Sequence, residues 1–144
     1  MPIVVFNQKG GVGKSTITCN LAAISASQGL RTLVIDLDPQ GNSTSYLLGA
    51  TASEDQPTVA GFFEHSLSYS FKSIPPTDFI VETPFENLDV MPSSPALTEL
   101  VVKLESRQKI YKLREALQKL GDTYDRIYID TAPALNFYTR AALI

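Results

Sequence analysis

The sequence predicts an α/β fold in which helices flank a mostly parallel β-sheet. Three short apolar runs, residues 3–7, 32–36 and 126–130, have the composition of buried strands, and the last two end in an acid. Segments with helical spacing of apolar residues lie between these runs. Such an alternation forms parallel β-α-β units that bind ligands at the carboxyl ends of their strands. Both acids are therefore expected at one edge of the sheet.

Helices are expected where apolar residues recur at helical spacing, namely over residues 14–28, 58–65 and 95–120. Ile17, Leu21 and Ile24 fall on one side of the first helix and predict its buried face, and Gly29 ends it. The third segment predicts either two helices or one helix that is broken near Ser106.

The remaining segments predict less regular structure. Residues 40–57 are rich in Gly, Asn, Ser and Thr and predict a loop with a short helical piece around Tyr46–Leu48. Residues 66–87 contain three prolines and predict irregular or edge-like structure. Residues 88–94 predict a strand that runs into a turn, and a last helix is expected to begin after Pro133.

The composition is that of an ordinary globular protein of 144 residues, with 44% hydrophobic and 19% charged residues. A net charge of −3 gives no global attraction to nucleic acid or anionic membranes, so such binding would need a local patch. The lone Cys19 excludes an internal disulfide and suits a reducing compartment. No apolar stretch approaches the ~20 residues that span a bilayer. We therefore expect one cytoplasmic domain over residues 1–144.

The segment FNQKGGVGKSTITCN, residues 6–20, contains most of a phosphate-binding loop. The pattern G-x-x-x-x-G-K-[ST] is matched at Gly13, Lys14 and Ser15, but Gln8 stands where its first glycine belongs. Backbone amides can converge on phosphate oxygens there, and the following helix adds its positive end. Lys14 would contact the β- and γ-phosphates and Ser15 would bind Mg²⁺. The expected nucleotide contacts are Lys9, Gly10, Gly11, Val12, Gly13, Lys14, Ser15 and Thr16.

Other glycine-loop chemistries fit this segment less well. A dinucleotide loop, G-x-G-x-x-G, would need glycine where Thr16 stands, and the N-K-x-D element with which GTPases read guanine does not occur. A glycine turn that only joins a strand to a helix, without binding phosphate, is disfavoured. The sequence GKST after a buried strand and before a helix is specific to phosphate-binding loops. Asp130, which ends the strand 126–130, is the natural acid to hold the Mg²⁺ through water.

Lys9 is a second lysine in the same loop. Because the amides of a nest point inward, the side chain of an early loop residue tends to point away from the phosphates of its own loop. Lys9 would then reach a phosphate on a facing copy of the protein, which favours a dimer that sandwiches its nucleotides. A surface lysine without a function is the alternative.

Three segments together resemble the deviant Walker family and, within it, the ParA/Soj partition ATPases: KGGVGKST (9–16), DLDPQGN (36–42) and YDRIYIDTAP (124–133). The resemblance covers essentially the whole chain and implies a P-loop NTPase-like sheet. It makes Lys9 the signature lysine of the family and Lys14 the phosphate-loop lysine.

The resemblance also assigns roles to the acids. Asp38 matches the residue that orients or activates the attacking water, and Asp130 matches the Walker B acid. Asp36 would act through metal-bound water, with capping of the strand end as its alternative. The implied catalytic residues are Lys9, Lys14 and Asp38, and the implied metal-site residues are Ser15, Asp36, Asp38 and Asp130.

The function implied by the resemblance is that of an ATP-hydrolysing switch in plasmid or chromosome segregation. ATP with Mg²⁺ would promote a homodimer that holds nonspecific DNA, and a ParB-type DNA-binding activator would stimulate slow hydrolysis to ADP. The protein would be nucleoid-associated if it binds DNA, and no membrane partner is expected. A helix side with Lys109, Lys112 and Lys119 could contact a phosphate backbone, although a solvated helix face is the favoured reading.

Two departures from the family qualify this expectation. The family commonly has D-x-P-P after the Walker B strand, where this chain has Asp130-Thr131-Ala132-Pro133. Family members also continue well beyond this length, so the chain resembles their N-terminal part and is expected to be truncated at its C-terminus. A MinD-like membrane-associated ATPase and a nucleotide-binding scaffold without turnover are the alternatives. DLDPQGN disfavours the first, and the cysteine supply excludes a nitrogenase iron protein.

Overall fold

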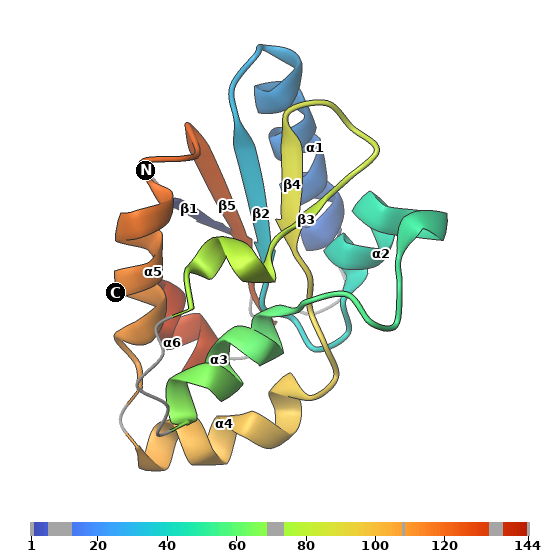
Figure 1. Cartoon of the computed structure of the whole chain (residues 1–144). Coiled ribbons are helices and arrows are strands. Elements are labelled where there is room, and N and C mark those ends of the chain that lie inside the picture. Colours follow the sequence, from blue (N-terminus) through green and yellow to red (C-terminus); the bar gives the residue numbers. More distant parts are fainter. Residues whose placement is uncertain (1, 6–12, 69–73, 108, 133–136, 144) are drawn as a thin grey trace.

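A five-stranded sheet in the order β1-β5-β2-β4-β3 forms the centre of the computed structural model, which describes residues 2–5, 13–68, 74–107, 109–132 and 137–143 (Figure 1). The strands are β1 (Pro2–Val5), β2 (Thr32–Asp36), β3 (Val81–Glu82), β4 (Leu88–Met91) and β5 (Arg126–Asp130). The pairs β1–β5, β5–β2 and β2–β4 are parallel, and β3 runs antiparallel to β4. The predicted α/β fold with a mostly parallel sheet is confirmed.

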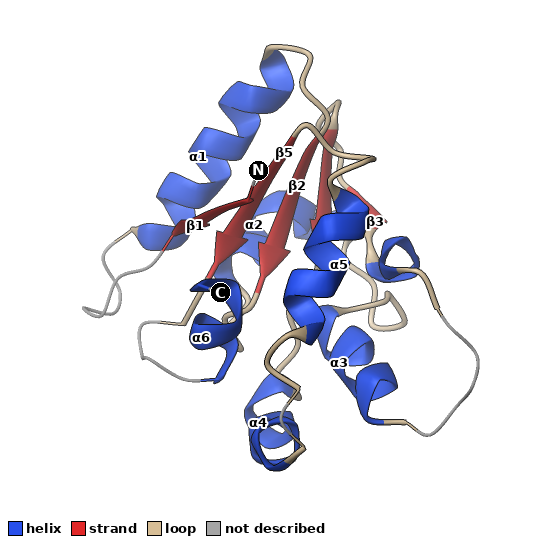
Figure 2. Ribbon diagram, turned by 90° about the vertical axis from the view of Figure 1, so that its left-hand side faces the viewer, coloured by secondary structure: helices blue, strands red, loops and turns tan. Residues whose placement is uncertain are grey.

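Helices cover both faces of this sheet (Figure 2). They are α1 (Lys14–Ser27), α2 (Asn42–Leu48), α3 (Val59–Leu67), α4 (Leu97–Ser106), α5 (Lys112–Leu120) and α6 (Phe137–Leu143). Helices α1 and α2 share one hydrophobic core with Val34 and Tyr128 of the sheet. Helices α3 to α6 share the other core with Leu33, Ile35 and Ile129. Because both faces are covered, β2 and β5 are continuous apolar runs rather than alternating ones.

The buried face of α1 differs from the predicted one. Ile17, Leu21 and Ile24 are all exposed, and Ile24 keeps 55% of its surface accessible. The side chains that α1 buries against the sheet are small: Thr18, Cys19, Ala22, Ser25 and Ala26. Small residues allow the helix to approach β5 and β2 closely, and the hydroxyl of Ser25 pairs there with that of Tyr128 at 2.6 Å. The periodicity of large apolar residues therefore identified the wrong side of this helix.

Other boundaries refine the sequence-based expectations. Helix α2 begins at Asn42, earlier than the piece expected around Tyr46–Leu48, because Gly41 adopts a left-handed conformation with φ of 68° and starts the helix there. The segment 95–120 forms two helices that separate after Ser106. Within 66–87, the edge-like expectation corresponds to β3 and a 3₁₀ turn at Pro76–Phe79.

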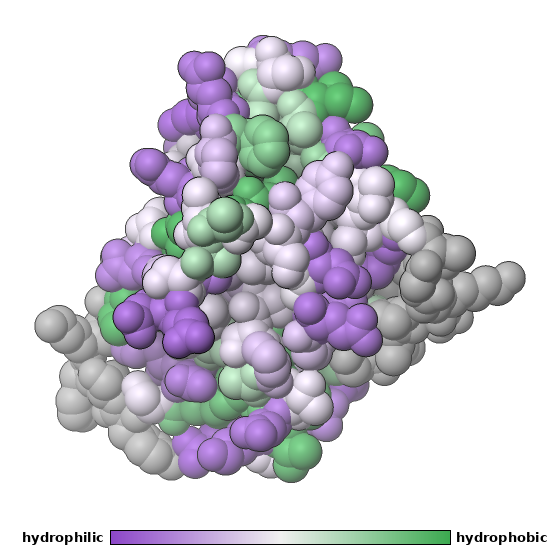
Figure 3. Space-filling view, turned by 90° about the vertical axis from the view of Figure 1, so that its right-hand side faces the viewer, coloured by the Kyte–Doolittle hydropathy of each residue, from purple (hydrophilic) through white to green (hydrophobic). Residues whose placement is uncertain are grey.

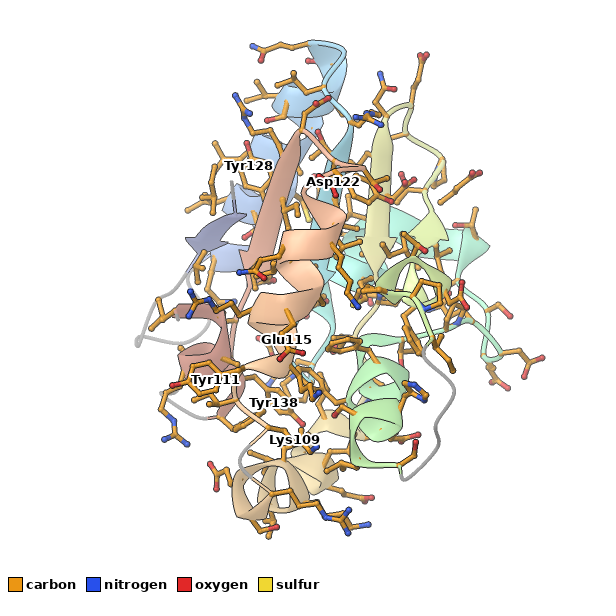
Figure 4. All side chains as sticks on the ribbon, turned by 60° about the vertical axis from the view of Figure 1, so that its left-hand side comes forward. Lys109, Tyr111, Glu115, Asp122, Tyr128 and Tyr138 are labelled. Atoms are coloured by element: carbon orange, nitrogen blue, oxygen red, sulfur yellow. The ribbon has the colours of Figure 1, made fainter. Side chains whose placement is uncertain are left out.

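The outer surface is mixed in character. On the face shown in Figure 3, apolar side chains form separate small groups among polar ones. Among the described residues, no helix has both the length and the apolar character needed to cross a membrane. Figure 4, in which the left-hand side of Figure 1 comes forward, shows Tyr138 of α6 among the helices, where its hydroxyl donates to the carbonyl of Leu97.

Candidate phosphate-binding site

Asp36 and Asp130 end two neighbouring parallel strands and lie directly opposite each other in the β2–β5 register. Helix α1 begins at the same edge of the sheet, since Lys14 and Ser15 both reach the carboxylate of Asp130. The Leu37 amide also donates to the Asp130 carbonyl at 2.8 Å, which continues the ladder beyond the last strand residue. The two acids and the start of the helix therefore meet at one common edge, as expected for ligand sites in parallel sheets.

The carboxylate of Asp130 is completely buried and receives three donors from the described part of the chain. The Lys14 ammonium pairs with Oδ1. The hydroxyls of Ser15 and Ser43 both donate to Oδ2, at 2.7 and 2.6 Å. A buried carboxylate is tolerated when it is both paired and hydrogen-bonded, and here both conditions are met.

Lys14 lies between two acids. Besides Asp130, its ammonium is 3.9 Å from Oδ2 of Asp38, and the side chains of Lys14 and Asp38 are 9% and 8% exposed. The other carboxylate oxygen of Asp38 accepts the backbone amide of Gln40 at 3.0 Å. One oxygen of Asp38 thus holds its own loop, while the other faces the lysine that is expected to contact phosphates.

Asp36 accepts hydrogen bonds from nearby donors on both of its carboxylate oxygens. Its Oδ2 accepts the amide of Thr44 at 2.9 Å and the hydroxyl of Thr44 at 2.7 Å, and its Oδ1 accepts the amide of Asp38 at 3.1 Å. Burial, followed by the charge of Asp130, raises the pKa of Asp36 to about 7, and the bonds from Thr44 and Asp38 oppose that rise. The structure therefore gives Asp36 a clear loop-holding contact, while its role at the metal stays a prediction.

Residues 13–16, at the N-terminus of α1, have the features of a helix start that binds an anion. Gly13 precedes the helix with φ of 70°, a left-handed conformation that favours glycine, and no side chain of residues 13–68 is seen to cap the helix start. The first turn carries no acid, and Thr16 is exposed. Helix N-termini with free amides bind phosphate groups. Four of the expected contacts, Lys9, Gly10, Gly11 and Val12, lie outside the described residues.

The donor set at Asp130 suits a magnesium ion. Mg²⁺ prefers oxygen ligands and keeps several waters, so it needs few protein ligands beside phosphate oxygens. The Ser15 hydroxyl and the Asp130 carboxylate provide two oxygens only 2.7 Å apart at the start of α1. In the described residues, no cluster of three or more histidine, cysteine or acidic side chains forms a metal site made of protein alone. These residues fit an ion that is held jointly with a nucleotide.

Sequence reasoning missed the hydroxyl residues that support both acids. Ser43 and Thr44 of α2 contact Asp130 and Asp36, and the Ser93 amide donates to the Thr44 hydroxyl at 2.9 Å. Their sequence signal is weak, because a run of Asn, Ser and Thr after a glycine is equally typical of a loop. A helix starting at Asn42 turns both hydroxyls inward, and that start was not expected.

Cys19 and the lysines near α5 were also considered from the sequence, and the structure shows where they lie. Cys19 is buried as a small core residue, and burial raises the pKa of its thiol to about 11. Lys109 precedes α5, so among the three lysines only Lys112 and Lys119 belong to that helix (Figure 4). Lys112 lies 3.6 Å from Glu115 in an exposed ion pair. Binding of DNA to this surface stays a prediction.

The sequence of this chain is similar to those of ParA and Soj proteins. The chain is 38% identical over 142 residues to the chromosome partitioning protein ParA of Myxococcus xanthus. The aligned region covers 98% of this chain and 47% of that protein. It is 37% identical over 142 residues to the sporulation initiation inhibitor protein Soj of Bacillus subtilis, covering 98% of this chain and 53% of that protein.

The fold is similar to that of cobyrinic acid a,c-diamide synthase from Mycobacterium smegmatis, crystallised with bound ADP and magnesium. The TM-score is 0.85 at 30% identity, over 99% of this chain and 55% of that chain. The chain therefore spans about half the length of the relatives it matches. These findings confirm the resemblance to ParA and Soj. The family described as an AAA domain matches residues 1–144, and the chain belongs to that family.

Proposed function

We propose that this chain binds ATP with Mg²⁺ at the edge formed by β2, β5 and α1, and hydrolyses it as a nucleotide-dependent switch of the partition type. The observation that carries the proposal is the meeting of Lys14 and Ser15 on the buried carboxylate of Asp130, at the start of helix α1. The similarity to ParA and Soj supports the partition role, whereas the structural match to a synthase of another activity supports only the nucleotide site.

The residues at the helix start have distinct roles in this proposal. The Lys14 ammonium leaves Asp130 for the β- and γ-phosphates, where a positive charge neutralises the transferring group. The Ser15 hydroxyl would hold the metal ion directly, and the Asp130 carboxylate would hold it through water. When bound, Mg²⁺ neutralises phosphate charge and orients the phosphate chain.

Asp38 positions the attacking water. Its Oδ2 lies 3.9 Å from the Lys14 ammonium, and its backbone is fixed because its amide donates to Asp36. Phosphoryl transfer depends mainly on positioning and electrostatic stabilisation, so a carboxylate held in this way can keep a water molecule in line with the γ-phosphate.

Nucleotide binding and turnover test this proposal directly. We expect the purified chain to bind ATP and ADP more tightly with Mg²⁺ than with EDTA, as measured by calorimetry. We expect slow phosphate release from ATP, measured with and without double-stranded DNA. Binding without any phosphate release would identify a scaffold rather than an enzyme, and absence of nucleotide binding would overturn the proposal.

The switch in this proposal is an ATP-dependent homodimer, in which Lys9 of each chain reaches the phosphates bound by the other. Lys9→Ala is then expected to retain ATP binding but to lose ATP-dependent dimerisation, as seen by light scattering. Lys119→Ala, an exposed lysine on α5, is the matched control and should dimerise like the parent. If Lys9→Ala dimerises with ATP as the parent does, Lys9 does not act across a dimer.

The proposed partners follow from the same role. The dimer would hold nonspecific DNA, and a ParB-type DNA-binding protein would stimulate hydrolysis and so release it. The similarity to a chromosome partitioning protein supports a role that involves DNA, and nucleoid association would follow from DNA binding.

A further inference from the structure

Helix α2 buries two hydroxyl residues where a short helix would ordinarily bury apolar ones. Ser43 is fully buried and Thr44 is 9% exposed. Burying a hydroxyl is unfavourable unless it is hydrogen-bonded, so each needs a partner inside the protein. Their partners are the two carboxylates of the phosphate site, although α2 supplies none of the residues assigned to the nucleotide or its cation.

Ser43 differs from the other donors on Asp130. Lys14 and Ser15 also bind that carboxylate, but both are assigned to the phosphates and the cation. When they turn to these ligands, Ser43 is, among the described residues, the donor that stays, at 2.6 Å from Oδ2. A buried carboxylate without donors is costly, and a metal-binding carboxylate is oriented by hydrogen bonds behind it. Ser43 therefore has the position of an orienting residue for the empty and the occupied site alike.

Thr44 connects three segments of the chain. Its amide and hydroxyl both hold Oδ2 of Asp36, and its hydroxyl accepts the amide of Ser93. Ser93 in turn donates through its hydroxyl to the carbonyl of Asp38. Since the Asp38 amide also donates to Asp36, the backbone of Asp38 is held from both sides.

We propose that Ser43 and Thr44 are positioning residues of the phosphate site: Ser43 orients Asp130 toward the cation, and Thr44 fixes Asp36 and with it the backbone of Asp38. This inference rests on the proposed function, since it concerns the cation and the water of the same site. The two residues should therefore have different effects. Ser43 should affect the magnesium-dependent binding of nucleotide, and Thr44 should affect the rate of ATP hydrolysis.

Ser43→Ala tests the first part. We expect the Mg²⁺-dependent gain in ADP affinity, taken as the ratio of dissociation constants in EDTA and in Mg²⁺, to fall about tenfold. Affinity in EDTA should change less than about twofold, because the Ser43 hydroxyl is directed to the Asp130 carboxylate rather than to the start of α1. Ser45→Ala, an exposed residue of the same helix, is the control and should keep the full ratio. An unchanged ratio in Ser43→Ala, or an equal loss with and without Mg²⁺, overturns the inference.

Ser43→Thr separates the hydroxyl from the packing. Threonine keeps the donor but adds a methyl group in a closed site, so it should behave better than alanine if the hydrogen bond matters. If filling of space is the only role, the larger threonine should be the worse of the two, in folding as well as in Mg²⁺ response. If Ser43→Ala does not fold, Ser43→Thr is compared with the parent alone: a retained Mg²⁺-dependent ratio supports the role of the hydroxyl, and a lost ratio in a folded Ser43→Thr overturns it.

Thr44→Val tests the second part, since valine has nearly the same shape without the hydroxyl. We expect kcat for ATP hydrolysis to fall about tenfold, with KM and ADP affinity unchanged, because Asp38 positions water rather than phosphate. A rise in KM with constant kcat would overturn the role of Thr44. A parent chain that binds no nucleotide would overturn the proposed function and this inference together, whereas a binding parent with an indistinguishable Ser43→Ala overturns the inference alone.

Discussion

Replacement of Lys14 by alanine is expected to lower the free energy of unfolding by about 3 kcal/mol, because it leaves the Asp130 carboxylate buried without its positive partner. That carboxylate is fully buried, and two serine hydroxyls are its other donors in the described structure. The same change should weaken ATP binding about 10- to 100-fold, the range expected for the loss of a hydrogen bond to a charged group. Urea unfolding and calorimetry measure the two effects.

Two further variants separate stability from binding. Lys14→Ala combined with Asp130→Asn removes the unpaired charge, so most of the stability should return while ATP affinity stays low. Lys112→Ala removes the lysine of an exposed pair with Glu115, and a change below about 0.5 kcal/mol is expected there. If Lys14→Ala unfolds at the same urea concentration as the parent, the ion pair with Asp130 does not stabilise the fold.

Replacement of Asp38 by asparagine is expected to reduce ATP hydrolysis about 10²- to 10⁴-fold while leaving ATP affinity within about twofold of the parent. Asparagine retains an oxygen that can accept the Gln40 amide, so the loop should keep its conformation. It loses the negative oxygen that faces Lys14 and would hold the water. Phosphate release and calorimetry on the same preparation measure both quantities.

The control for this variant is Asp122→Asn, which changes an exposed carboxylate after α5 (Figure 4). It should hydrolyse ATP at the parent rate. A rate in Asp38→Asn equal to that of the control would remove Asp38 from the mechanism and shift the positioning of water to another group.

The sequence was sufficient for the parts of the fold that depend on local composition. The strands ending in Asp36 and Asp130 were predicted because apolar runs of that length are typical of buried parallel strands. Their convergence at one edge followed from the geometry of β-α-β units. Their direct pairing could not be predicted, because the order of strands in a sheet depends on packing between distant segments.

The face of α1 and the hydroxyls of α2 escaped prediction for related reasons. A helix that packs closely on a sheet buries small residues such as Ala22, and these give a weaker periodic signal than Ile17 or Ile24 on the exposed side. Buried hydroxyls are recognisable only from their acceptors. Ser43 and Asp130 are 87 residues apart in the chain, so their contact appears only once the fold brings them together.

The opposition of Asp36 and Asp130 in adjacent strands also bears on how the centre of the sheet finds its alignment. Strands β2 and β5 carry apolar side chains on both faces, so a register shift of one residue between them would still bury apolar side chains. Such a slip would, however, turn the Asp130 side chain to the wrong side and separate it from lysine and serine. The contacts of Asp130 with Lys14 and Ser15 therefore favour the observed alignment of β2 and β5 over a shifted one.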